Sequence, residues 1–121
     1  MLCMSPTALI VDDHPSFRAS ARAVLEAEGF DVVGELEDGA SVLEAVVALD
    51  PDVVLLDVQL PDMSGFDVCA LLEDCEARRG QVILVSSRDL ADYGDLVESS
   101  CACGFVPKGD LSGEVITALL A

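Results

Sequence analysis

Residues 53–57 have the sequence Val-Val-Leu-Leu-Asp, and the fold prediction works outward from them. Turn-forming residues flank this apolar run, with Asp-Pro-Asp at 50–52 before it and residues 61–65, which begin with Pro and end with Gly, after it. A short apolar run between turns is typical of a strand buried on both faces of a parallel sheet. In such sheets ligands bind just beyond the carboxyl ends of the strands. The Asp57 carboxylate therefore lies where a functional site is expected.

Three more strand-like runs end in polar side chains. Residues 8–11 run into Asp12 and Asp13, residues 82–85 into Ser86, and residues 105–107 into Lys108. Parallel strands of one sheet have their carboxyl ends at one edge. We therefore expect three carboxylates, one hydroxyl and one amine to converge there.

Between these strands, apolar residues recur at helical spacing. The predicted strands are 7–11, 30–33, 53–57, 81–85 and 104–107, and the predicted helices are 15–28, 42–49, 68–79, 90–97 and 111–120. Strand–helix–strand units cross over right-handed, so this alternation predicts a single doubly wound α/β domain with the flavodoxin-like strand order 2-1-3-4-5. The shorter strand at 30–33 is expected near an edge. Gly94 costs about 1 kcal/mol inside a helix, so the fourth helix is expected to be the softest.

The composition limits the classes of partner. The chain has 121 residues, 52% of them apolar, which suffices for one aliphatic core. Its 23 acidic and six basic residues give a net charge of -17, which opposes binding to nucleic acid and to anionic membranes. The acidic excess is interpreted as a solvated surface, with an acidic docking patch as the alternative. Apolar runs are too short to span a bilayer.

The five cysteines favour a reducing, cytoplasmic setting. Their number is odd, and they do not have the dense spacing of a disulfide framework. Cys101 and Cys103 lack a second ligand pair for zinc, because His14 is the sole histidine. Cys69 and Cys75 fall within a helical pattern and are interpreted as core residues.

The carboxylates allow two interpretations. Asp12, Asp13 and Asp57 at adjacent strand ends would repel one another unless a hard divalent cation lay among them, and oxygen ligands with room for water favour Mg²⁺. The alternative is that Asp12 and Asp13 only cap the following helix. Asp57 is a candidate nucleophile towards a phosphoryl group, and Lys108, the only lysine, could neutralise the charge that is transferred. Ser86 offers a hydroxyl, although serines are also common in turns.

At this point the chain resembles a known family over its whole length: the receiver domains of two-component response regulators. The residues that carry the resemblance are Asp12-Asp13, Leu55-Leu56-Asp57 with Pro61 and Gly65 downstream, Val85-Ser86, and Phe105 three residues before Lys108. The opening Asp12-Asp13-His14-Pro15 and the ending Lys108-Gly109-Asp110 are similar to receivers attached to LuxR-type DNA-binding domains.

The resemblance implies that residues 1–121 form a receiver domain, with 1–6 as a short disordered lead. It implies a signalling receiver rather than an enzyme, one that promotes its own phosphoryl transfer and slow dephosphorylation. Asp57 takes a phosphoryl group from a sensor histidine kinase. Asp13, Asp57 and the Gln59 backbone carbonyl hold Mg²⁺, and Asp12 helps through a water molecule. Ser86 and Lys108 bind the phosphoryl oxygens.

The resemblance also implies a switch, in which Ser86 moves inward and Phe105 rotates. The face made by the fourth helix, the strand at 104–107 and the last helix changes as a result. Gln59 and Arg88 tune the lifetime of the phosphoryl group. Proline precedes Lys108 here instead of following it, which leaves a cis peptide at Val106-Pro107 or elsewhere undecided. Phe105 lacks the tyrosine hydroxyl of some relatives, so a hydrogen-bonded inward state is not expected.

Rival functions fit less well. A haloacid dehalogenase-type phosphatase needs an aspartate two residues after the nucleophile, where Gln59 stands. A flavodoxin-like FMN carrier needs a Ser/Thr/Gly-rich phosphate loop, to which Asp12-Asp13 is electrostatically opposed. A pseudo-receiver that works by protein interaction without phosphorylation remains the main alternative. The kinase, the output through a C-terminal DNA-binding domain or a protein partner, and homodimerisation on phosphorylation stay open. The chain is either a stand-alone receiver or part of a longer regulator.

Overall fold

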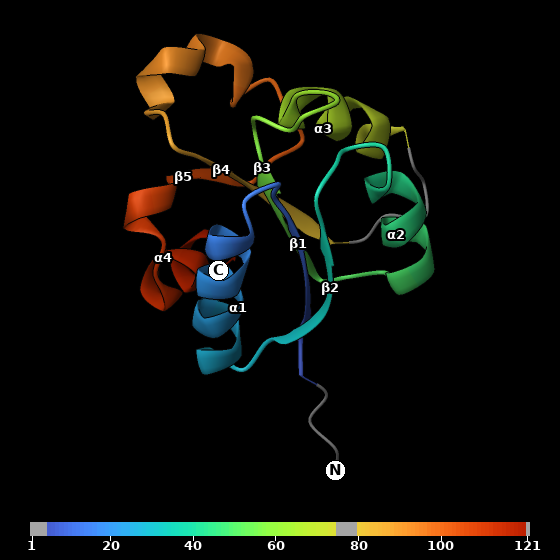
Figure 1. Ribbon diagram of the computed structural model, residues 1–121. Coiled ribbons are helices and arrows are strands. Elements are labelled where there is room, and N and C mark those ends of the chain that lie inside the picture. Colours follow the sequence, from blue (N-terminus) through green and yellow to red (C-terminus); the bar gives the residue numbers. More distant parts are fainter. Residues whose placement is uncertain (1–4, 75–79, 121) are drawn as a thin grey trace.

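The computed structural model describes residues 5–74 and 80–120. Five parallel strands form one sheet in the order β2-β1-β3-β4-β5, which confirms the predicted fold class and strand order. The strands are β1 (Thr7–Val11), β2 (Asp31–Leu36), β3 (Val53–Asp57), β4 (Gln81–Ser86) and β5 (Gly104–Pro107). Figure 1 shows helices on both faces of the sheet, and β2 lies at one edge, as expected for the strand predicted at 30–33.

β3 is the central strand, and all five of its residues are buried. Alternate side chains point to opposite faces of the sheet, so Leu56 joins one core cluster and Leu55 the other. Leu56 is in register with Val11 of β1, and Asp57 with Val85 of β4. This register brings the ends of β1, β3 and β4 level at one edge of the sheet.

The helices divide between the two faces. α1 (Pro15–Ala27) and α4 (Gly113–Leu120) pack on one face, and α2 (Val42–Leu49) and α3 (Gly65–Glu73) pack on the other (Figure 1). Proline at the first position opens α1, because its missing N–H has no partner to lose there. Among the described residues, no helix is both long enough and apolar enough to cross a membrane.

The fourth predicted helix is wrong in kind. Residues Leu90–Leu96 form a kinked 3₁₀ segment, η1, rather than an α-helix. Gly94 has φ 58° and ψ −127° inside it, a conformation that breaks the helix and that glycine adopts without steric cost. The helical spacing of the apolar residues therefore did not predict the conformation of this segment, whereas Gly94 indicated where the helix would break.

Other boundaries differ by a few residues. β2 runs to Leu36, three residues further than predicted, and a short 3₁₀ turn, η2 (Lys108–Asp110), precedes α4. The predicted continuation of the third helix through residue 79, including Cys75, lies outside the described residues, as do residues 1–4 of the predicted lead at 1–6. Among the described residues no peptide bond is cis, which includes the bond between Val106 and Pro107.

Replacing Gly65 with alanine is expected to lower the free energy of unfolding by about 2 kcal/mol. An ideal Cβ at Gly65 would lie 2.6 Å from the Asp57 carbonyl oxygen and 3.0 Å from Val58 Cα, both backbone atoms that cannot rotate away. Urea unfolding measures the loss. Gly109→Ala is the matched control, because a Cβ there meets no heavy atom within 4 Å. Equal losses in the two variants would contradict the close approach of α3 to β3.

Candidate functional site

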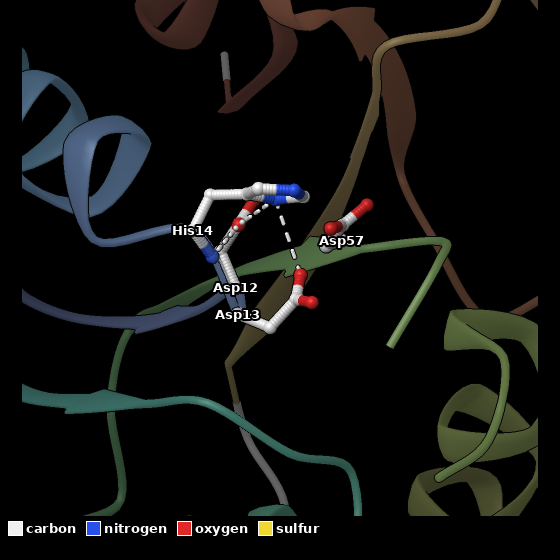
Figure 2. A group of neighbouring side chains, drawn as sticks. All are labelled: Asp12, Asp13, His14 and Asp57. Carbon is white, nitrogen blue, oxygen red and sulfur yellow. Dashed lines mark hydrogen bonds and ion pairs between the residues drawn. The ribbon is translucent and has the colours of Figure 1, made fainter. Parts of the chain in front are cut away.

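Three aspartates from two strand ends meet at the carboxyl edge of the sheet. Asp12 and Asp13 follow β1, and Asp57 is the last residue of β3. One ligand atom from each, together with a ring nitrogen of His14, lies within 4.8 Å of the others (Figure 2). Asp12 is fully buried and Asp57 is 2% exposed, while the Asp13 and His14 side chains are 34% and 63% exposed. The pocket therefore opens to solvent on the side of Asp13 and His14.

Lys108 brings the only lysine of the chain into this pocket. Its Nζ lies 2.7 Å from Asp12 Oδ2 and 3.3 Å from Asp57 Oδ2, and its side chain is 15% exposed. The ammonium also lies 4.7 Å from the centroid of the Phe17 ring, within the range of a cation–π contact. Two carboxylates and one aromatic face thus hold the lysine, and its shorter contact is with Asp12 rather than with Asp57.

Two buried carboxylate oxygens in the pocket are poorly satisfied. Within the described part of the chain, Asp12 Oδ2 and Asp13 Oδ1 have no hydrogen-bond partner. Lys108 Nζ is 2.7 Å from the first and His14 Nδ1 is 3.1 Å from the second, so both lie at ion-pair distance without hydrogen-bond geometry. Buried polar oxygens seldom remain without a hydrogen bond, so these two atoms are candidate ligands for a cation. The acidic cluster could therefore bind a metal ion.

Opposing effects act on the pKa of the Asp57 carboxyl. Burial raises its pKa, and the neighbouring charge of Asp12 raises it further. The Gln59 backbone N–H, which donates to Asp57 Oδ1 at 3.0 Å, and the Lys108 ammonium both lower the pKa. Burial is the largest of these effects, and the net pKa of Asp57 lies above its usual range. Additional positive charge in the pocket would therefore stabilise the ionised form.

Ser86, at the end of β4, is fully buried. Its Oγ accepts a hydrogen bond from the Arg88 backbone N–H at 3.0 Å and lies 2.6 Å from the hydroxyl of Tyr93. Phe105 is half-buried, and its ring centroid is 5.7 Å from that of Tyr93. The side chains of Gln59 and Arg88 are exposed. Ser86 thus contacts a residue of η1 from the end of β4.

Sequence reasoning missed two of these residues. His14 was considered only as the sole histidine and as part of the Asp12-Asp13-His14-Pro15 opening, although its position directly after Asp12-Asp13 was a usable signal for the pocket. Tyr93 carried no such signal, because its contact with Ser86 depends on how η1 folds back over the end of β4.

Comparisons with known proteins agree with this geometry. The model of the response regulator receiver domain family matches residues 8–119. The DNA-binding transcriptional activator EvgA of Escherichia coli (strain K12) is 34% identical over 116 residues, which are 94% of this chain and 55% of EvgA. This chain therefore spans about half the length of that relative.

Solved structures show the same architecture. The signal receiver domain of NarL from Mycobacterium tuberculosis is 33% identical with a TM-score of 0.86, and the match covers 98% of this chain and 95% of that one. A LuxR-family two-component response regulator from Aurantimonas sp. SI85-9A1 has a TM-score of 0.85 at 23% identity, over 97% of this chain and 86% of that one, and so supports the fold alone. The chain therefore belongs to the family of response regulator receiver domains, which are signalling modules.

Proposed function

We propose that Asp57 is the phosphoacceptor of this receiver and that a phosphohistidine of a sensor histidine kinase is its donor. One observation carries the proposal: the buried Asp57 carboxylate lies at the open edge of the sheet with the Lys108 ammonium 3.3 Å away. Membership in the receiver family supports a kinase as the partner.

A carboxylate oxygen of Asp57 attacks phosphorus, a new P–O bond forms, and the P–N bond to the donor histidine breaks with its electron pair on the leaving imidazole. Negative charge is spread over the phosphoryl oxygens during this transfer, so neutralisation and positioning do most of the work. Lys108 supplies a mobile positive charge beside Asp57, and Ser86 can donate a hydrogen bond to a phosphoryl oxygen. Gln59 and Arg88, whose side chains are exposed, are proposed to tune how fast the phosphoryl group is lost.

Mg²⁺ is the proposed cofactor. The oxygen-rich donor set of Asp12, Asp13 and Asp57, two of whose buried oxygens lack hydrogen bonds, fits a hard divalent cation, and the Gln59 carbonyl is a fourth candidate ligand. When bound, Mg²⁺ would neutralise charge on the acidic pocket and on the phosphoryl oxygens.

The proposed output is a change in the face made by η1, β5 and α4. Ser86 and Phe105 link the pocket to that face, and one new charged group biases a two-state arrangement. Because relatives such as EvgA are DNA-binding, the whole protein is proposed to act on transcription through a DNA-binding domain or a protein partner, with homodimerisation as one route. We place the domain in the cytoplasm, where the thiols of Cys69, Cys101 and Cys103 stay reduced.

Incubation with acetyl phosphate and Mg²⁺ is expected to add one labile phosphoryl group, located at Asp57 by peptide mass spectrometry. Omitting Mg²⁺ should remove most of the adduct. The alternative, a pseudo-receiver that works only by protein contacts, predicts no adduct and no Mg²⁺ binding by calorimetry. That pair of results would overturn the proposal.

A further inference from the structure

The Ser86 hydroxyl has an unusual set of partners. A serine hydroxyl has one proton to donate and two lone pairs that accept. The Arg88 backbone N–H occupies one lone pair at 3.0 Å. The Tyr93 hydroxyl, at 2.6 Å, either accepts the serine proton or fills the second lone pair. Which of the two it does decides whether Ser86 keeps a proton for the phosphorylation site.

The chemistry of the two hydroxyls favours tyrosine as the donor. A phenol has a pKa near 10 and is more acidic than an aliphatic alcohol, so it donates more readily and accepts less readily. With Tyr93 donating, both lone pairs of Ser86 are occupied. The Ser86 proton is then its one remaining hydrogen-bonding group, and within the described residues no acceptor is paired with it. A phosphoryl oxygen on Asp57 would supply that acceptor.

Packing holds the Tyr93 ring in place. Phe66 and Phe105 contact it edge-on, with centroid distances of 5.5 Å and 5.7 Å. Aromatic pairs with this geometry have a preferred orientation, which fixes where the phenol points. Gly94, directly after Tyr93, turns the chain with its positive φ. Phe105 has no hydroxyl. The hydroxyl of Tyr93, which belongs to a different element, η1, is provided in its place.

We propose that Tyr93 is a positioning residue for phosphoryl transfer: its hydroxyl donates to Ser86 and thereby orients the serine proton towards the phosphoryl oxygen on Asp57. This inference rests on the proposed phosphoacceptor function. The same hydrogen bond connects Ser86 to η1, so a movement of the Ser86 side chain would directly affect that segment.

A double-mutant cycle tests the inference by the rate of Asp57 phosphorylation with acetyl phosphate and Mg²⁺. Tyr93→Phe keeps the ring and removes the hydroxyl. It is expected to slow the reaction about five-fold, equivalent to ~1 kcal/mol. In a Ser86→Ala background the same change is expected to have less than about a two-fold effect, because the two residues act as one unit. The acetyl phosphate concentration giving half-maximal rate should stay unchanged, since Tyr93 does not contact the donor.

A spectrum of the unphosphorylated protein provides an independent arm. The chain has one tyrosine and no tryptophan, so its near-ultraviolet tyrosine band reports Tyr93 alone. A phenol that donates a hydrogen bond absorbs at longer wavelength than one that accepts. Ser86→Ala should therefore shift the band to shorter wavelength, while Ser86→Thr, which keeps the hydroxyl, should leave it in place. A shift to longer wavelength would overturn the assigned direction of the bond.

The outcomes separate this inference from the proposed function. An adduct that forms equally fast with Tyr93→Phe, or faster, overturns the inference and leaves Asp57 as the phosphoacceptor. Equal slowing in both backgrounds also overturns it, because Tyr93 would then act through packing and not through Ser86. No adduct on the wild-type protein overturns the proposed function and this inference with it. Urea unfolding of each variant checks that the fold is retained.

Discussion

Asp57→Asn is expected to abolish the phosphoryl adduct completely and, at neutral pH, to raise the melting temperature. The amide of asparagine is not a nucleophile towards phosphorus, so the loss is total. The gain in stability follows from the environment of Asp57, where burial and the charge of Asp12 raise the carboxyl pKa. A neutral side chain of the same shape avoids the cost of an ionised group there. The gain is about 1 kcal/mol, which in a domain of this size is roughly 4 °C.

The gain should depend on pH in a defined direction. The pKa of Asp57 is higher in the folded than in the unfolded chain, so the folded state binds the proton more tightly. The stability contributed by the protonated carboxyl is fully present below the unfolded pKa, about 3.9, and is lost as pH rises through the raised folded value. The two proteins should therefore be equally stable at low pH and diverge as the pH rises. Thermal unfolding without Mg²⁺ measures this difference.

Asp110→Asn is the matched control, because it makes the same chemical change at an exposed residue of η2 and should alter stability by less than about 0.5 kcal/mol. Mg²⁺ should reverse the order, since a ligand at a hundred times its dissociation constant adds about 2.7 kcal/mol to the protein that binds it. Loss of stability in Asp57→Asn at neutral pH without Mg²⁺ would contradict the assigned electrostatics of the pocket.

Lys108→Met is expected to cause the largest loss of stability, about 3 kcal/mol in the absence of divalent cations. Removing the ammonium leaves Asp12 and Asp57, both buried, without the cation that lies 2.7 Å and 3.3 Å from them. Breaking a buried ion pair by removing one partner costs far more than the net worth of the intact pair. Millimolar Mg²⁺ should restore much of the loss. Phosphorylation should slow strongly as well, because the charge beside Asp57 is gone.

Arg22→Met provides the comparison for Lys108→Met. Arg22 also pairs with two carboxylates, Glu26 and Glu35, but its side chain is 38% exposed and the pairs are screened by solvent. Its removal should cost far less stability than the removal of Lys108, because exposed ion pairs contribute little. Similar losses in the two variants, or no rescue of Lys108→Met by Mg²⁺, would show that the pocket carboxylates do not depend on the lysine.

The fold could be predicted from the sequence because it depends on patterns within short stretches of the chain. Each apolar run is short, ends in a polar residue and alternates with a helical pattern, and right-handed crossover leaves few topologies for such a chain. The run at 53–57 could not be exposed on either face, so it had to be the centre of the sheet. The ends of the parallel strands then lie at one edge of the sheet. The sequence alone therefore predicted that Asp57 and Lys108 lie close together.

Tertiary structure decided the rest. Lys108 lies closer to Asp12 than to Asp57, and its ammonium also lies over the ring of Phe17. Spacing along the chain does not determine these side-chain contacts. Tyr93 contacts Ser86 from η1, a 3₁₀ segment kinked at Gly94 where the apolar spacing predicted a helix. Spacing along the chain determines which elements form and where their ends meet. Which side chain finally touches which depends on packing between elements that are distant in sequence.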